Sequence, residues 1–265
     1  MKRFVPFLDR SPRVAVIRLH GSISTGTRGQ LNDVALAPII ERAFRRGKPA
    51  AVALSINSPG GSPVQSALIA ARIRRLADEK EVPVIAFVED AAASGGYWLA
   101  CAADEIFADR SSIVGSIGVI MSSFGLDQFI GKHGVERRVY TSGESKSQLD
   151  PFRPENPEDV ARIKAIGSEI HAAFIEHVKA ARGDRLAEDA RLFTGEFWTG
   201  QKARELGLID GIGHLVPVLK ERYGDKLRFA VYGPKRSLFR RFGATLAGDV
   251  FDAAEERGLW ARFGL

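Results

Sequence analysis

The sequence contains very little cysteine, with a single residue at position 101 in a chain of 265. One cysteine excludes an intrachain disulfide framework and is typical of a reducing compartment. Cys101 lies in an alanine-rich segment with a helical pattern. We therefore expect a small buried residue there rather than a reactive thiol.

Long apolar runs are also absent. No stretch of the chain approaches the roughly 18 apolar residues that a membrane-spanning helix needs. The opening segment, MKRFVPFLDR, carries positive charge but lacks the apolar core of a signal peptide. These two absences predict a soluble, cytoplasmic protein.

Motifs for metals, nucleotides and nucleic acids are missing as well. The chain has no zinc-type spacing of Cys and His, no phosphate-binding loop and no arginine cluster interleaved with aromatic residues. Its net charge of +6 favours anionic surfaces without naming one, and we interpret the excess as a solvated face. We expect no metal, no cofactor and no nucleic-acid partner.

What is present is a regular alternation of strand and helix patterns. Apolar runs predict strands at 13–19, 50–56 and 82–88, and helical periodicity predicts helices at 31–46, 62–78 and 155–182. Shorter elements are expected as a helix at 94–102, strands at 105–108 and 113–121, and a helix from about 124. This order indicates an α/β fold with a parallel sheet and crossover helices. We expect one domain over 1–234, followed by an amphipathic helical tail over 235–265.

Two glycine-rich loops follow predicted strands. They are SINSPGGSP at 55–63 and ASGGYW at 93–98. Ligands bind at the carboxyl ends of strands in open α/β sheets, and two such loops can present two N–H donors to one oxygen. Ser94 is therefore either a helix N-cap among packing glycines or a nucleophile beside an oxyanion hole.

A nucleophilic serine needs a base, because a free hydroxyl is a poor nucleophile. None of the five histidines lies in a glycine-rich loop, and His171 and His177, on the long predicted helix, are expected to be exposed. The polar loop YTSGESKSQLDPF at 140–152 contains one lysine, Lys146. A lysine in a loop is ordinarily a surface residue. If Ser94 is a nucleophile, however, Lys146 is the natural base of a Ser–Lys dyad.

With these motifs the sequence resembles the signal peptide peptidase A family, and most closely its short SohB-like branch. The resemblance extends over about residues 14–215 and is carried by NSPGGS, AASGGYW, ADEIFA, GSIGVI, SGESKSQLDPF and TGEFWTGQKARELGLID. The 52-residue interval from Ser94 to Lys146 is similar to that between the family's serine and lysine. The resemblance implies a membrane-associated serine endopeptidase with the spiral α/β fold shared by the Clp protease and crotonases.

Carried over by position, the resemblance implies a role for each motif residue. Ser94 would be the nucleophile and Lys146 the general base, with the N–H groups of Gly61 and Gly95 as the oxyanion hole. Ser116 would hydrogen-bond the lysine amine. The implied reaction is hydrolysis of a peptide bond through an acyl-enzyme.

The flanking motif residues are expected to have supporting roles. We expect Tyr97 and Trp98 to pack the helix after Ser94, and Pro151 and Phe152 to fix the lysine loop.

Two other functions compete with the peptidase. A crotonase-like enzyme acting on acyl-CoA would use the same oxyanion hole but would leave Ser94 and Lys146 without a role. A non-catalytic scaffold would leave Ser94, Lys146 and the two glycine-rich loops without a role.

The expected partners are a peptide or protein substrate and further copies of the chain. The resemblance implies a ring-like or dome-like homo-oligomer with its sites facing inward. We favour a tail that packs on the core of its own chain or on a neighbouring subunit. The alternative is that it lies on anionic lipid at the cytoplasmic face of the membrane.

Overall fold

The computed structural model describes residues 11–25, 31–143, 145–234 and 257–265, and the statements below concern these residues. They form an eight-stranded sheet with the order β6-β5-β3-β2-β1-β8, in which β4 also pairs with β3 and β7 pairs with β4. All pairings are parallel except β5 with β6. The strands are β1 (Arg13–His20), β2 (Ala51–Ser58), β3 (Val84–Ala93), β4 (Glu105–Ala108), β5 (Ile113–Gly115), β6 (Phe197–Thr199), β7 (Gly211–Ile212) and β8 (Arg228–Tyr232).

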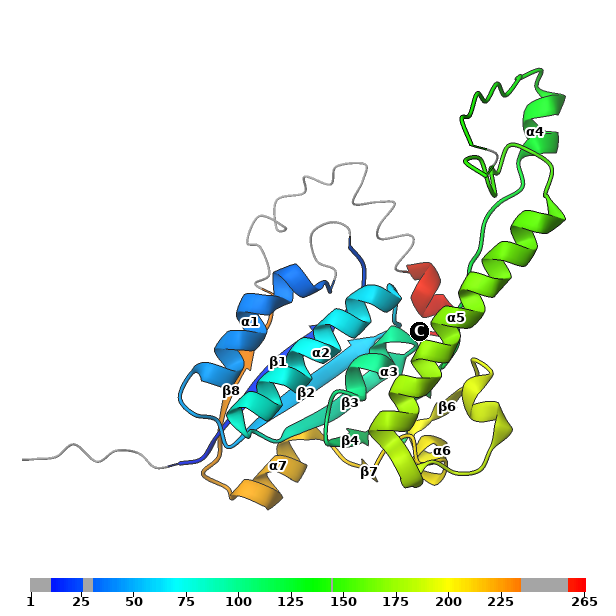
Figure 1. Cartoon of the computed structure of the whole chain (residues 1–265). Helices are drawn as coiled ribbons and strands as arrows, with labels where there is room; N and C mark the ends of the chain where they lie inside the picture. Colours follow the sequence, from blue (N-terminus) through cyan, green and yellow to red (C-terminus); the bar gives the residue numbers. More distant parts are fainter. Residues whose placement is uncertain (1–10, 26–30, 144, 235–256) are drawn as a thin grey trace, which may run out of the picture.

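Helices cover both faces of this sheet (Figure 1). One face packs against α1, α2 and α3, while α7 covers part of the other face. The helix α5 crosses the end of the molecule and continues beyond the sheet (Figure 1). The helices are α1 (Asp33–Arg45), α2 (Pro63–Lys80), α3 (Gly95–Ala100), α4 (Asp127–Lys132), α5 (Pro157–Arg182), α6 (Gly200–Glu205) and α7 (Leu215–Tyr223).

The two-sided burial explains why the central strands read as continuous apolar runs. In β1, Ile17 and Leu19 face the larger core beneath α1 and α2, whereas Val14 and Val16 face the smaller core beneath α7. Strands covered on both faces need apolar residues at every position. The predicted α/β fold with parallel strands and crossover helices is confirmed.

One expectation about the middle of the chain is wrong. The strand predicted at 113–121 ends at Gly115, because Ser116 has a left-handed backbone (φ 53°) and the chain then leaves the sheet. The predicted long helix is present as α5, and its apolar face is buried only in its second half, at Phe174 and Val178, while Ile166 is 42% exposed. The first half of α5 has no part of the core to pack against.

The tail prediction falls mostly outside the described residues, since 235–256 are not among them. The described C-terminal residues contain a short helical segment at 257–261. After this segment the ring of Phe263 packs edge-on against Phe197 of β6, with ring centroids 5.1 Å apart. This contact places the described end of the chain on the sheet edge.

Candidate active site

Ser94 lies at the sharp junction between β3 and α3. Its backbone is left-handed (φ 51°, ψ −122°), which is a strained conformation for a residue other than glycine. Its N–H donates to the Gly115 carbonyl at 2.8 Å, and its carbonyl accepts from the N–H groups of Tyr97 and Trp98. The side chain forms no cap for α3. Ser94 thus occupies the N-cap position of α3, but its side chain does not cap the helix. The main chain is fixed while the hydroxyl remains available for other contacts.

The loop after β2 touches the Ser94 junction. Gly60 and Gly61 have φ values of +100° and +141°, a range that favours glycine. A Cβ at Gly60 would lie 2.8 Å from Ser94 Cβ and from the Gly95 nitrogen, and one at Gly61 would lie 2.0 Å from the Ile23 carbonyl oxygen. Only glycine permits this close approach of the two loops.

The approach leaves two N–H groups near each other. The Ile23 N–H donates to the Gly60 carbonyl, and the Ser62 N–H donates to the Ile23 carbonyl. In this parallel bridge the Gly61 N–H points away from Ile23. A Cβ on Gly95 would lie 3.4 Å from the Gly61 nitrogen, and Gly95 is the first residue of α3, where an N–H has no acceptor within the helix. This arrangement can present two donors to one oxyanion.

Ser116 is the next residue that the structure brings to Ser94. It follows β5, in which Gly115 pairs with Ala93 and accepts the Ser94 N–H. Ser116 is buried, and its own N–H donates to the Glu196 carbonyl at 2.7 Å. The turn after β5 is therefore fixed by two hydrogen bonds, one at Gly115 and one at Ser116, and Ser116 lies beside the junction of β3 and α3.

Lys146 is placed elsewhere. It is exposed and lies on a projection that we call the arm, comprising residues 119–143 and 145–156 (Figure 1). After Ser116 the chain runs along α5 towards its N-terminus: the Ile117 carbonyl meets His171, and the Leu149 N–H meets Asp159. Twelve residues of helix separate these two contacts, which is about 18 Å. The structure therefore brings together Ser94, Gly95, Gly61 and Ser116, but not Lys146.

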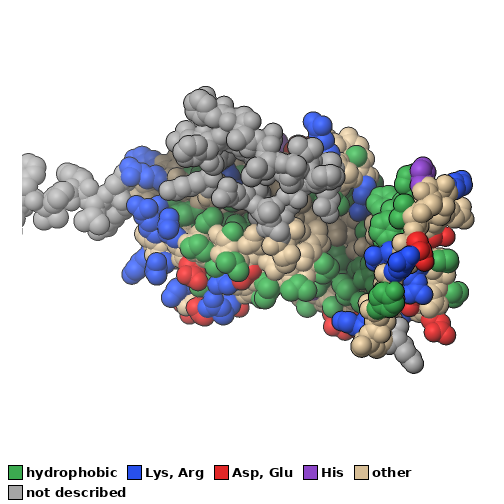
Figure 2. Space-filling model, turned by 90° about the horizontal axis from the view of Figure 1, so that it is seen from above, with side chains coloured by type: hydrophobic (Ala, Val, Ile, Leu, Met, Phe, Trp, Pro, Cys, Tyr) green, Lys and Arg blue, Asp and Glu red, His purple; other side chains and the backbone are tan. Residues whose placement is uncertain are grey.

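The arm and the first half of α5 enclose a groove with a volume of about 1310 Å³. Its walls include Met121, Phe124, Leu149 and Ile163. Hydrophobic side chains are also visible on the outer surface of the arm, at the right-hand end of the molecule (Figure 2). Phe124 is 82% exposed and Tyr140 is 92% exposed.

Two histidines of α5 are partly buried, so the expectation that they are exposed is wrong. His177 Nε2 donates to the Trp98 carbonyl at 3.0 Å and its ring stacks on the Trp98 indole, with centroids 4.6 Å apart. Burial lowers the pKa of His177. His171 Nε2 donates to the Ile117 carbonyl at 3.1 Å. Helix α5 thus contacts the segment after Ser94 through His177 and the segment after Ser116 through His171. No motif or spacing in the sequence predicted these two contacts.

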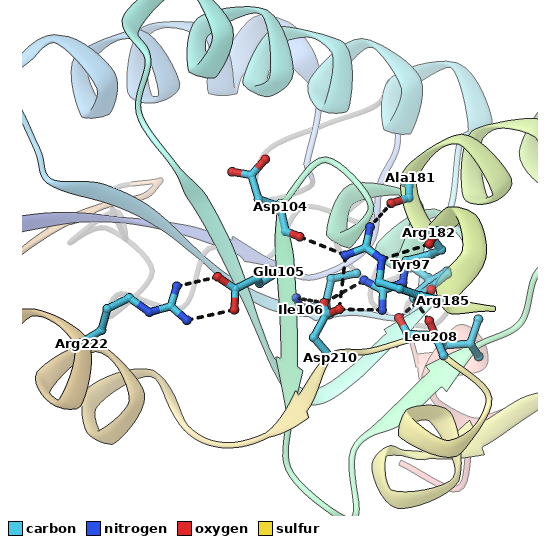
Figure 3. Close-up of polar contacts among 11 residues, drawn as sticks. Tyr97, Asp104, Glu105, Ile106, Ala181, Arg182, Arg185, Leu208, Asp210 and Arg222 are labelled. Carbon is cyan, nitrogen blue, oxygen red and sulfur yellow. Dashed lines mark hydrogen bonds and ion pairs between the residues drawn. The ribbon is translucent and has the colours of Figure 1, made fainter. Parts of the chain in front are cut away.

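The expectation that Tyr97 and Trp98 pack the helix after Ser94 is confirmed. The Tyr97 ring is buried and its hydroxyl donates to the Leu208 carbonyl at 2.7 Å (Figure 3). The indole of Trp98 also stacks on Phe174 of α5. The predicted burial of Cys101 is confirmed as well, and burial raises the pKa of its thiol to about 12. This cysteine is an unreactive core residue.

A buried ion pair lies below Tyr97 (Figure 3). Arg182, which is 2% exposed, donates two hydrogen bonds to the Asp210 carboxylate and one to the Gly207 carbonyl. The Ile106 N–H donates to the same carboxylate at 2.7 Å. Burial alone would raise the pKa of Asp210, but the hydrogen bonds from Arg182 and Ile106 outweigh it and hold that pKa below its usual value. The pair joins the end of α5 to the strands that flank α3.

No cluster of three His, Cys, Asp or Glu side chains among the described residues is arranged to hold a metal ion. None of the helices in the described ranges is long and apolar enough to cross a membrane.

Comparison with known proteins places the chain in a family. The profile of peptidase family S49 matches residues 77–224. The chain is 48% identical to a Brucella melitensis protein named Na(+)/H(+) antiporter NhaA, over 100% of this chain and 39% of that protein. It is 34% identical to the chloroplastic serine protease SPPA of Arabidopsis thaliana, over 77% of this chain and 31% of that protein. The chain thus spans less than half the length of either relative.

A solved structure shows the same fold. It is a lysine-to-alanine mutant of the 1510-N membrane-bound stomatin-specific protease in complex with a substrate peptide. The match covers 88% of this chain and 96% of that one, with 15% sequence identity and a TM-score of 0.52. At this identity the likeness concerns the fold alone. The matched profile confirms the resemblance that the motifs around Ser94 carried: the chain belongs to peptidase family S49.

Proposed function

We propose that this chain is a serine endopeptidase that cleaves peptide bonds through an acyl-enzyme. Membership of family S49 supports a serine-type peptidase. One observation carries the assignment of the residues: the strained Ser94 junction touches the Gly60–Gly61 loop, so that a serine hydroxyl and two N–H groups converge. This constellation suits attack on a carbonyl whose oxygen becomes negatively charged.

In this mechanism the Ser94 Oγ attacks the scissile carbonyl and transfers its proton to the amine of Lys146. The oxyanion of the tetrahedral intermediate accepts hydrogen bonds from the Gly61 and Gly95 N–H groups. The intermediate collapses as the protonated lysine donates to the leaving amine. A water molecule, deprotonated by the lysine, then attacks the acyl-enzyme and releases Ser94. The Ser116 hydroxyl accepts a hydrogen bond from the lysine amine and orients it.

The base reaches Ser94 from a second copy of the chain. Within one chain Lys146 is exposed on the arm. The arm's contact with Asp159, made by Leu149, lies about 18 Å along α5 from the His171 contact beside Ser116. The arm also exposes Phe124 and Tyr140, which suits a surface covered in an assembly. A lysine amine in water is protonated at neutral pH, and removal from water favours its neutral form. Insertion of the arm into a neighbouring copy would supply that burial.

The substrates that suit this proposal are apolar peptides, such as remnants of signal peptides or other membrane-derived segments. The family resemblance supports this class, and the hydrophobic side chains along the groove are compatible with it. No observation on the structure favours the crotonase-like alternative.

Covalent labelling tests the assignment directly. A fluorophosphonate probe is expected to add one adduct, which peptide mapping places on Ser94, and Ser94→Ala is expected to add none. A chain that stays unlabelled while a control serine hydrolase reacts would contradict the proposal. It would then favour the acyl-CoA enzyme or the scaffold.

A further inference from the structure

The strand that leads to Ser94 contains a bulge immediately before the active-site turn. Along most of its length β3 pairs in register with β2, up to Ile56 opposite Val88. The next pair is Ser58 opposite Ala92, so one residue of β2 faces three of β3. Two extra residues are thus inserted into β3. Bulges of this kind bend a strand and redirect the side chains that follow.

The bulge sets which residue faces Ser94. With the register of Ile56 and Val88 continued, Ser94 would stand opposite Ser62. With the two extra residues it stands opposite Gly60, and a Cβ on Gly60 would lie 2.8 Å from Ser94 Cβ. The shift is two residues of strand, or about 6.6 Å. Without the two extra residues, Ser94 would lie opposite Ser62 and would not face the Gly60–Gly61 loop.

One side chain of β2 binds both halves of the bulge. The Asn57 amide nitrogen donates to the Asp90 carboxylate at 2.6 Å, and the Asn57 amide oxygen accepts from the Ala91 N–H at 3.2 Å. Asp90 is one of the residues that pair with neither β4 nor β5 on the far side of β3. Asn57 therefore gives the Ala91 N–H an acceptor within the bulge and also holds the Asp90 side chain.

The other polar groups of the bulge are held as well, but less directly. The Ser55 hydroxyl donates to the Glu89 carboxylate at 2.6 Å, which fixes a side chain rather than the main chain. The Ser112 hydroxyl donates to the Glu89 carbonyl from the segment before β5. Ser112 thus contacts the main chain at the start of the bulge, whereas Asn57 contacts it at Ala91, the bulge residue nearest to Ser94.

We propose that Asn57 is a positioning residue of the active site, which clamps the β3 bulge and so sets the register of Ser94 against the Gly60–Gly61 loop. The proposal rests on the proposed function, because it concerns the geometry of the oxyanion hole. Asn57 touches no reacting atom. It acts through Asp90 and Ala91.

The test compares single variants with an exchange of the two side chains. Asn57→Ala removes both hydrogen bonds, and Asn57→Asp places a second carboxylate against Asp90. The double variant Asn57→Asp with Asp90→Asn restores a donor and an acceptor in swapped positions. Ser55→Ala is the matched control, since it removes two neighbouring hydrogen bonds, to the Glu89 and His20 side chains, neither of which reaches the main chain of the bulge.

A displacement of Ser94 from its donors weakens stabilisation of the transition state more than binding of the substrate. We therefore expect kcat for a fluorogenic apolar peptide to fall about 10- to 100-fold in Asn57→Ala and Asn57→Asp, with KM little changed. The double variant is expected to recover most of kcat, and Ser55→Ala to stay near wild type. The melting temperature of Asn57→Ala is expected to fall by only about 2–4 °C. Fluorophosphonate labelling of Ser94 should slow in parallel with kcat.

Wild-type kcat in Asn57→Ala would overturn the proposal, and so would a double variant as slow as Asn57→Asp. A loss of activity that only follows a loss of folded protein would also overturn it. If the wild-type chain neither cleaves the peptide nor labels at Ser94, the proposed function itself fails and the positioning role fails with it. Labelling of the wild type and of Asn57→Ala at equal rates would refute the positioning role alone.

Discussion

The two halves of the proposed dyad lie in very different surroundings. Ser94 stands in the body of the protein, where its own N–H, the Tyr97 hydroxyl and the Trp98 carbonyl are all engaged in hydrogen bonds. Lys146 stands on the arm, whose helix α4 buries none of its residues. The proposed nucleophile and oxyanion hole thus lie together within one chain, whereas the proposed base lies at a surface. Substitutions in the arm and in the body are therefore expected to have different effects on activity and on stability.

The largest effect is expected from Lys146 itself. Lys146→Arg and Lys146→Met should both lower kcat by about 10⁴-fold, as loss of a member of a catalytic dyad or triad does. Arginine keeps the charge but does not release a proton near neutral pH. The wild type should gain activity as pH rises to neutral and alkaline values, because only the neutral amine accepts a proton. Peptide cleavage assays measure both effects.

Unlike substitutions in the body, these changes should leave the monomer's stability unaltered, because the side chain is exposed. Thermal melting of each variant is the control. Turnover of Lys146→Arg at the wild-type rate would show that another group is the base.

The next effect concerns the exposed aromatic residues of the arm. Phe124→Ser combined with Tyr140→Ser should reduce the assembly to a species near 28.9 kDa and lower activity by at least about tenfold, because buried aromatic residues dominate interfaces. Light scattering measures the mass. Val34→Ser is the matched control, since Val34 is equally exposed but lies on α1. An unchanged mass in the arm variant would remove the arm from the interface.

A smaller effect, on stability rather than chemistry, is expected in the body. Arg182→Met leaves the Asp210 carboxylate without its main partner and should lower the free energy of unfolding by about 3 kcal/mol. Arg191→Met is the matched control, because its ion pair with Asp189 lies at the surface. Urea unfolding of the two variants compares them. Equal stability of both would show that the buried pair contributes nothing to the body.

The smallest effect is a pH dependence of the same pair. The pKa of Asp210 is lowered in the folded chain from an ordinary value of 3.8. The stability that Asp210 contributes is therefore fully present above about pH 4 and is lost as the pH falls through its lower folded pKa. Unfolding measured from pH 5 downwards should show this loss in the wild type and a weaker one in Arg182→Met. A steeper acid loss in the variant would contradict the assignment.

Much of the body was predictable from the sequence. Apolar runs such as 50–56 and 82–88 predicted the central strands, because strands buried on both faces leave no room for polar residues. The glycine pairs at 60–61 and 95–96 predicted a close approach of two loops, and the structure shows it. These signals are local, so a linear pattern carries them.

The remaining features depend on tertiary contacts that no local pattern reports. Helical periodicity predicted α5 itself, but it does not report that Ile166 lies where the helix has left the core. The contacts of His171 and His177 with main-chain carbonyls follow from where α5 crosses the body. Spacing along the chain also suggested that Lys146 belongs with Ser94. It says nothing about whether one chain or two bring them together.

The central claim is that one active site takes Ser94 from one copy and Lys146 from another, and mixing two inactive variants tests it most directly. Ser94→Ala and Lys146→Met are co-expressed with different tags, and mixed assemblies are isolated. If the site is shared, random mixing restores about a quarter of the sites, each with an intact serine from one copy and an intact lysine from its neighbour. Peptide cleavage should therefore return to about that fraction of the wild-type rate. Mixed assemblies as inactive as the separate variants would contradict the claim and show that the arm brings Lys146 to Ser94 within its own chain.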